Sequence, residues 1–274
     1  MAFRSAGAAA GALCLSFALI ACNGQGSTET QSCQPASPTA HPTSAPEGHD
    51  VKVVESGFTT VAGKTNAAFP VISMGAVLEN PSDQVAYRTR VTFDAQDVRG
   101  SSVILDTQSR YSMIEVPVIQ PGEKVAVGVS LIADERSTAT TISVTPDLST
   151  WLPSGDSSNG LAPVVATLVP ENTDHDTDGS AHLQYTVANT NCDNLIYRGV
   201  SVVWRDADGT LVGGDTDTAR SSFPCNIDSS DKAFRADTKE NSTPESVDFS
   251  KSDVTVFCDV NRRSEAPGAG KPIN

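Results

Sequence analysis

The stretch AHLQYTVAN, from Ala181 to Asn189, decides the fold class of this 274-residue chain. Apolar residues occupy every second position of the stretch, and this period of two is typical of a β-strand with one buried face. Residues 125–131 alternate in the same way, whereas no window from Val51 onward keeps apolar residues at helical spacing. Short strands separated by Gly, Pro and Asp turns predict an all-β fold arranged as sandwiches.

A comparison of the sequence with itself, offset by 109 residues (181 − 72), indicates an internal repeat. Ile72, Met74, Ala76 and Leu78 then coincide with the apolar positions of 181–187. Both copies continue with a polar turn, a Tyr-Arg pair and an apolar strand, and two copies of roughly 100 residues suit tandem immunoglobulin-like β-sandwiches. The Tyr-Arg pairs are Tyr87-Arg88 and Tyr197-Arg198.

The order of these features resembles the FxLYD and related tandem immunoglobulin-like domains of bacterial and archaeal surface proteins. That family has an Asn after its second strand, an aromatic residue that ends the next strand, an aspartate before a glycine turn, and then Pro-Gly-Glu. The resemblance implies a fold and display at a surface, and it implies no activity. Its residues are Asn80, Phe93-Asp94 and Pro121-Gly122-Glu123 in the first copy, and Asn189, Trp204 and Asp206–Gly209 in the second.

The first residues predict the compartment. Arg4 precedes an apolar run that is too short to cross a bilayer and is typical of a signal peptide. Leu19-Ile20-Ala21-Cys22 resembles the lipobox of bacterial lipoproteins, which implies cleavage before Cys22 and attachment of lipid to its sulfur. The alternative is an ordinary secretory signal in which the cysteine is fortuitous. We expect a cell-membrane protein, lipid-anchored on the extracytoplasmic face.

The composition and the breaks in the pattern divide the chain further. A segment without large apolar residues follows Cys22 and is expected to be a disordered tether. The formal charge of −14 on the whole chain argues against nucleic acid as a partner. Trp151 interrupts a Pro- and Ser-rich linker, where it either docks on a neighbouring domain or stays exposed. We expect a signal peptide at 1–21, the tether at 22–50, sandwiches at 51–146 and 163–262, a linker at 147–162 and a disordered tail at 263–274.

Asp174, Asp176 and Asp178 are the sharpest local signal for a bound ion. Three carboxylates at alternate positions before Gly179 match the start of a calcium loop. The twelfth position is Tyr185 rather than a bidentate Glu, so a neighbouring loop would have to complete the site. The alternative is a solvated acidic loop between strands. Apart from possible calcium, no cofactor is predicted.

A disulfide between Cys225 and Cys258 is predicted from strand parity. Phe223 and Ile227 share the face of Cys225 in an extended segment that we expect to be a strand, and apolar residues share the face of Cys258, so both sulfurs should point inward. Three successive antiparallel strands bring the ends of the first and third together. Cys192 would then be left for Cys33 in the tether, which is a weaker prediction; the alternative is that Cys192 bonds Cys225 or Cys258.

The sequence shows no constellation for catalysis. Nucleophilic catalysis needs a base oriented beside a Ser or Cys, and no such spacing is visible. We therefore expect a non-enzymatic binding or adaptor module of the bacterial cell envelope, held at the membrane by lipid, whose partner is an envelope or surface protein. The alternatives are a solute-binding lipoprotein that works with a transporter and, less favoured, an envelope enzyme.

Overall fold

The structure, a computed structural model, describes residues 50–62, 69–153, 161–219, 223–229, 232–260 and 270–274. The regular structure in these residues is β-strand, apart from two single-turn 3₁₀ helices at Ser109–Tyr111 and Pro170–Asn172. The all-β prediction is therefore confirmed. The predicted signal peptide and nearly all of the tether lie outside the described residues.

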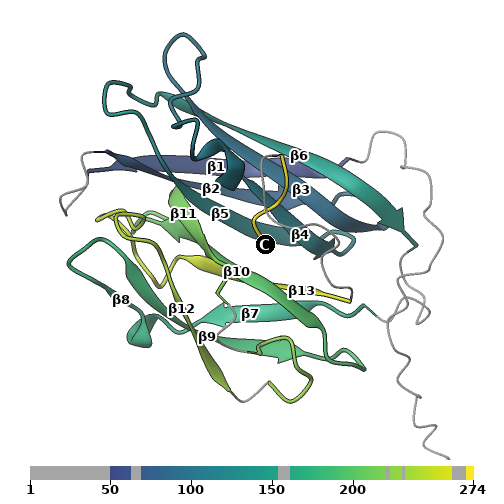
Figure 1. Cartoon of the computed structure of the whole chain (residues 1–274). Coiled ribbons are helices and arrows are strands. Elements are labelled where there is room, and N and C mark those ends of the chain that lie inside the picture. Colours follow the sequence, from purple (N-terminus) through teal and green to yellow (C-terminus); the bar gives the residue numbers. More distant parts are fainter. Residues whose placement is uncertain (1–49, 63–68, 154–160, 220–222, 230–231, 261–269) are drawn as a thin grey trace, which may run out of the picture. The chain divides into compact units, whose positions relative to one another are not determined.

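The first half of the chain forms a sandwich of two antiparallel three-stranded sheets (Figure 1). One sheet has the order β1-β2-β5 and the other β4-β3-β6. Their strands are β1 Lys52–Val61, β2 Val71–Glu79, β3 Val85–Gln96, β4 Met113–Ile119, β5 Lys124–Ile132 and β6 Thr141–Leu152.

The second half repeats this topology. One sheet has the order β12-β9-β7, with the short β8 also paired to β9, and the other has the order β11-β10-β13. The strands β7, β9, β10, β11, β12 and β13 take the places of β1 to β6, so the repeat inferred from the sequence is a repeat of structure. They span β7 Val164–Leu168, β8 Asp174–His175, β9 Ala181–Asn189, β10 Ile196–Arg205, β11 Leu211–Asp217, β12 Ala233–Asp237 and β13 Asp253–Asp259.

Each sandwich has its own apolar core. The first is built on the inward residues of β2, β3 and β5, and the second on those of β9, β10 and β13 around Trp204 and Tyr185. Phe257 is an exception, because it extends from β13 into the core of the first sandwich. The two cores are therefore joined by a side chain of the second repeat.

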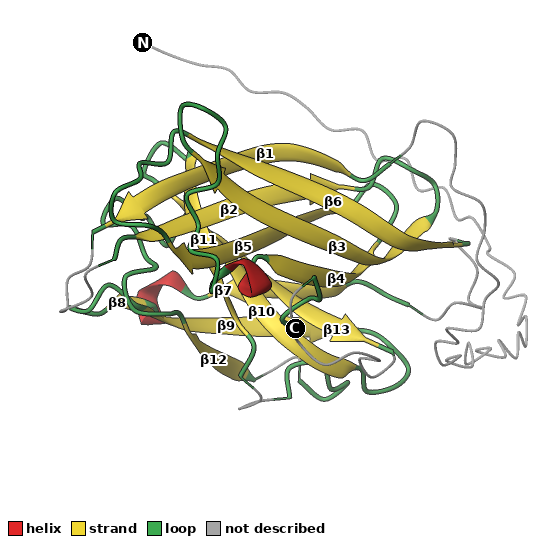
Figure 2. Ribbon diagram, turned by 45° about the horizontal axis from the view of Figure 1, so that its top comes forward, coloured by secondary structure: helices red, strands yellow, loops and turns green. Residues whose placement is uncertain are grey.

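The sheets β1-β2-β5 and β11-β10-β13 lie face to face, which gives four β-layers in the order β4-β3-β6, β1-β2-β5, β11-β10-β13, β12-β9-β7. Figure 2 shows most strands of the second half below those of the first. The path of β10 shows how they cross. Arg198 contacts Glu115 of β4, Ser201 contacts Gly128 of β5, and Arg205 contacts Glu55 of β1. β10 thus runs across the strands of the first sandwich, as in orthogonal sheet packing.

Two expected boundaries need correction. β6 continues to Leu152, with Trp151 buried in the first core, so residues 147–152 belong to the first sandwich and not to a linker. The tail is ordered at its end as well, since the amide of Asn274 donates to the Glu115 carbonyl and accepts from the Glu115 N–H, both at 2.8 Å. The Pro and Gly content of the tail could not reveal this docking, because it depends on a distant strand.

Candidate functional site

Glycines allow the two facing sheets to approach closely. A Cβ added to Gly75 would overlap the carbonyl oxygen of Gly213, and one added to Gly128 would overlap the carbonyl oxygen of Val202. Ser73 spans the gap, since its Oγ accepts from the Gly214 N–H at 3.0 Å. The interface is therefore a backbone-to-backbone contact.

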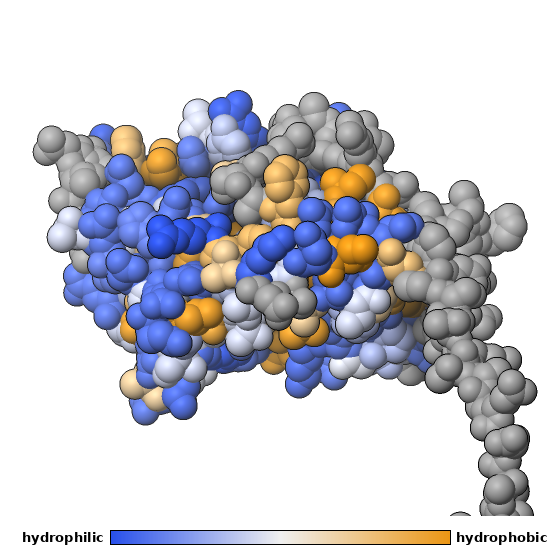
Figure 3. Space-filling model, turned by 90° about the horizontal axis from the view of Figure 1, so that it is seen from below, coloured by the Kyte–Doolittle hydropathy of each residue, from blue (hydrophilic) through white to orange (hydrophobic). Residues whose placement is uncertain are grey.

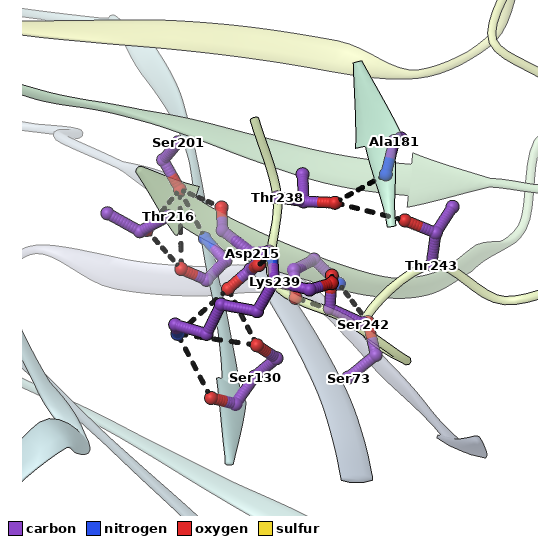
Figure 4. Close-up of polar contacts among 12 residues, drawn as sticks. Ser73, Ser130, Ala181, Ser201, Asp215, Thr216, Thr238, Lys239, Ser242 and Thr243 are labelled. Carbon is purple, nitrogen blue, oxygen red and sulfur yellow. Dashed lines mark hydrogen bonds and ion pairs between the residues drawn. The ribbon is translucent and has the colours of Figure 1, made fainter. Parts of the chain in front are cut away.

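A buried polar network lies in this interface (Figure 4). Its centre is the carboxylate of Asp215 on β11, which is fully buried. Asp215 Oδ1 accepts from Ser130 Oγ at 2.7 Å and from Lys239 Nζ at 3.1 Å, and Oδ2 accepts from the Lys239 backbone N–H at 2.8 Å. Because Ser130 belongs to the first sandwich, one carboxylate joins both halves.

Ser130 and Lys239 have the residue types of a nucleophile and its base, so catalysis has to be considered. Lys239 Nζ lies 3.3 Å from Ser130 Oγ. However, the hydroxyl of Ser130 donates to a carboxylate and is buried between two sheets, where a substrate carbonyl could not reach it. A catalytic nucleophile must meet its substrate, so this geometry favours a structural role.

A second network connects the sandwiches at β4. The carboxylate of Asp259 accepts from Arg198 Nη1 at 2.8 Å, from Arg88 Nη2 at 3.2 Å and from the Tyr87 hydroxyl at 2.9 Å. Arg198 also donates to Glu115 at 3.1 Å. Burial opposes the charge of Arg88, but Asp259, followed by Tyr87 and Glu115, outweighs it and raises the pKa of its guanidinium.

The structure explains the repeated Tyr-Arg pair, which the sequence alone did not. The register of β10 shifts between Tyr197 and Gly199, so Arg198 lies at a bulge, whereas the pairing of β3 omits Arg88 without a shift in register. Arg88 has a φ of 59°, a conformation that a non-glycine residue rarely adopts. Both arginines reach the carboxylate of Asp259. The repetition itself was a visible signal, but the shared partner in β13 was not.

A small pocket lies where the two sandwiches meet near the ends of β4 and β13. Its volume is about 40 Å³, and its lining includes Val118, Glu123, Leu161, Leu195 and Cys258. Burial raises the pKa of the Glu123 carboxyl. A pocket of this size accommodates a few water molecules, whereas sites for small solutes have volumes of hundreds of Å³.

The three aspartates of the proposed calcium loop belong to the hairpin between β8 and β9. Asp178 Oδ1 accepts from the N–H and the hydroxyl of Ser180, and these hydrogen bonds lower the pKa of Asp178. Asp176 Oδ2 lies 3.4 Å from His182 Nε2. In the described part of the chain no three His, Cys, Asp or Glu side chains gather as a metal site. Calcium binding stays a prediction, which thermal melts with calcium or a chelator would test.

The structure contains the predicted disulfide between Cys225 and Cys258, with Cα atoms 5.7 Å apart. Part of its rationale was wrong. Residues 223–229 form turns rather than a strand, and Phe223 and Ile227 are exposed. The two cysteines still meet at one end of the sandwich, because the turns lie before β12, which runs away from this end, and β13 returns to it.

The remaining predicted sites are only partly described. Cys192 is disulfide-bonded, but Cys33, its predicted partner, and the lipidation site Cys22 lie outside the described residues. None of the helices among the described residues is long and apolar enough to cross a membrane.

No protein-family model, curated protein or solved structure matches the chain.

Proposed function

We propose that this protein is a lipid-anchored, extracytoplasmic binding or adaptor module of the bacterial cell envelope that acts by contact with another envelope or surface protein and not by catalysis. The lipobox-like sequence ending at Cys22 supports the anchor. The resemblance to FxLYD-type immunoglobulin-like domains supports display at a surface.

The observation that carries the proposal is the face-to-face packing of the two sandwiches. β10 uses one face for its own core and the other for the first sandwich, and Asp215 and Asp259 join residues of both halves. The networks around Asp215 and Asp259 contain side chains that could have served as a catalytic acid, base or nucleophile. These side chains hold the two sandwiches together instead. A rigid head loses little conformational entropy when it binds, which suits a module that presents a fixed surface.

The solute-binding alternative draws no support from the pocket beside Glu123, whose volume is about 40 Å³. Such a lipoprotein would need a cavity that encloses most of its ligand. The exposed surfaces of the described strands and turns are better suited to contact with a macromolecule.

Crosslinking on intact cells, followed by identification of the proteins that co-purify, tests the proposal. Enrichment of one specific envelope protein is expected, and the Cys22→Ser variant, which is released or left unprocessed, should lose it. Recovery of a transporter permease would favour the solute binder. Unchanged membrane association of the Cys22→Ser variant would refute the anchor.

A further inference from the structure

The turns at 223–229 are held rigidly at one end of the second sandwich. The disulfide joins Cys225 to β13, and the Cys225 carbonyl accepts from the Leu195 N–H at 3.0 Å and from the Asn189 side chain at 2.8 Å. The Ile227 N–H donates to the Asn194 side chain at 2.9 Å. We call residues 223–229 the braced loop.

The braced loop exposes apolar side chains to solvent. Phe223 is 72% exposed and Ile227 is 48% exposed. Val165 is 56% exposed and lies at the same end of the sandwich, because its neighbour Val164 pairs with Asn189, the residue that contacts the braced loop. Figure 3, which views the molecule from below, shows apolar side chains exposed at several places on this face, on the left as well as on the right. Large apolar side chains exposed at one end of a domain are candidates for an interaction site.

The tether is predicted to attach at this same end. Cys192 lies in the turn between Asn189 and Leu195, both of which contact the braced loop. It is disulfide-bonded, and Cys225 and Cys258 are joined to each other. Among the six cysteines of the chain, Cys33 is the partner that remains once the signal peptide is removed and Cys22 carries lipid.

A bond between Cys33 and Cys192 would shorten the connection to the membrane. Only 11 residues (33 − 22) separate the lipidated position from the bond. A flexible segment of that length has a typical end-to-end distance of about 20 Å, and full extension reaches about 40 Å. The end of the sandwich that carries Phe223 would therefore be held close to the bilayer.

The opposite end of the second sandwich is acidic. Carboxylates lie there on the β8–β9 hairpin, in the β10–β11 turn and at the ends of neighbouring strands. An anionic lipid surface repels these carboxylates. These acidic residues are Asp174, Asp176, Asp178, Asp206, Asp208, Asp237, Asp248 and Asp253. Among the described residues, the braced-loop end carries fewer exposed carboxylates, namely Asp193 and Asp228, and Asp228 is paired with Lys232, so charge and apolar exposure favour the same orientation.

We propose that the braced loop, through Phe223 and Ile227, contacts the lipid surface in which the protein is anchored, so that the acidic end of the second sandwich points away from the membrane. The inference rests on the proposed lipid anchor. The contact is shallow, because Asp228 in the loop and Asp193 and Asn194 beside it are exposed polar residues that stay at the level of the headgroups.

Tryptophan fluorescence on the full-length, lipid-modified protein tests the contact. Phe223→Trp places a reporter in the braced loop, whereas the native Trp151 and Trp204 are buried. Val98→Trp is the matched control, because Val98 is 85% exposed and lies in the turn after β3, at the opposite end of that strand from Tyr87 and its contact with Asp259. Both variants are reconstituted into phosphatidylcholine vesicles with brominated acyl chains, which quench tryptophan.

We expect Phe223→Trp to lose emission and shift to shorter wavelength, while Val98→Trp does neither. The Cys33→Ser/Cys192→Ser double variant should weaken the quenching of Phe223→Trp by lengthening the tether. Absence of quenching at position 223, or equal quenching at both positions, would overturn the inference. A spectral shift only in native membranes would overturn it in favour of a protein partner at the braced loop.

Flotation with the vesicles distinguishes failure of the lipid contact at the braced loop from failure of the proposed lipid anchor. Protein that floats without quenching at position 223 refutes the lipid contact and leaves the anchor intact. Protein that does not float refutes the anchor, and the inference fails with it.

Discussion

Gly128 shows how a missing side chain sets the distance between the two sandwiches. It pairs with Gly75 in the first repeat, and the equivalent pair in the second repeat is Gln184 and Arg235. The two sheets have the same topology, yet the sheet with glycines is covered and the sheet with Gln184 and Arg235 faces solvent. Small residues on the second face of a strand were therefore the signal in the sequence for a buried contact.

Replacement of Gly128 by alanine should destabilise the protein by about 3 kcal/mol, because the added Cβ meets backbone atoms of Val202 and Asp215 that cannot move aside. Gly209→Ala is the control. Gly209 has a φ of 84° and no neighbouring atom within 4 Å, so alanine there should cost about 1 kcal/mol. Urea denaturation measures both, and equal losses would contradict the close approach of the sheets.

His182 should make stability depend on pH. A hydrogen bond to Asp237, aided by Asp176, raises its pKa. Because the folded-state pKa exceeds the unfolded value of about 6.5, this stabilisation is complete below about pH 6.5 and is lost as the pH rises through the folded-state pKa. Melting temperatures of His182→Gln and the wild type should converge at alkaline pH, with His175→Gln as the control. A constant difference at all pH values would contradict the assignment.

At the scale of strands, much of the fold was predictable and the surfaces were not. Period-two patterns located β2, β5 and β9, because an apolar face against a core leaves a local signature. The turns at 223–229 were predicted to be a strand, since apolar residues at alternate positions can also be exposed on a braced loop. The pairing of Cys225 with Cys258 followed from strand parity, which does not depend on such details.

The disulfide should contribute about 3 to 4 kcal/mol to stability by restricting an unfolded chain over a separation of 33 residues. The Cys225→Ser/Cys258→Ser double variant should unfold at correspondingly lower denaturant concentration. Peptide mapping without reductant provides the check on connectivity, and a peptide joining Cys192 to either cysteine would refute the pairing.

The ion pair between β1 and β10 should couple the two sandwiches. Arg205 donates to both oxygens of Glu55, at 2.6 and 2.7 Å, and this hydrogen bonding lowers the pKa of Glu55. A double-mutant cycle should give a coupling of about 1 kcal/mol, reduced by partial exposure. The Asp228–Lys232 pair, which is exposed and local, should give nearly none.

The coupling also has a defined pH window. Because the folded-state pKa of Glu55 lies below the unfolded value of about 4.3, the stabilisation is present above about pH 4.3 and is lost as the pH falls through the folded-state pKa. A coupling energy that persists at pH 2 would contradict this origin.

For the whole molecule, the sequence predicted two separate domains, and the structure shows two sandwiches that share a buried interface. The apolar pattern alone does not reveal this contact, because the centre of the interface is glycine, serine and one buried carboxylate, Asp215, with only a small apolar cluster beside them. Residues 147–152 were predicted to be part of a linker for a similar reason: Trp151 has its partners in strands far away in the chain.

The two sandwiches should unfold in one transition. Phe257 packs in the first core while its strand belongs to the second, so neither core survives intact without the other. Scanning calorimetry should give a single peak with calorimetric and van't Hoff enthalpies in agreement. Two resolved transitions would show that the halves are energetically independent.

The packing of β2 and β5 under β10 and β11 also has a consequence during synthesis and export. The chain is made from its N-terminus, so the first sandwich can form before residues 196–217 have emerged. Until then its β2 and β5 face, which presents Ser73, Gly75, Val77 and Gly128, has no cover. An uncharged flat sheet face of this kind associates readily with other chains. A ribosome or translocon that pauses between the two repeats would therefore leave a half-made protein that is prone to aggregate. Rapid synthesis and folding of the second repeat cover the exposed face of the first.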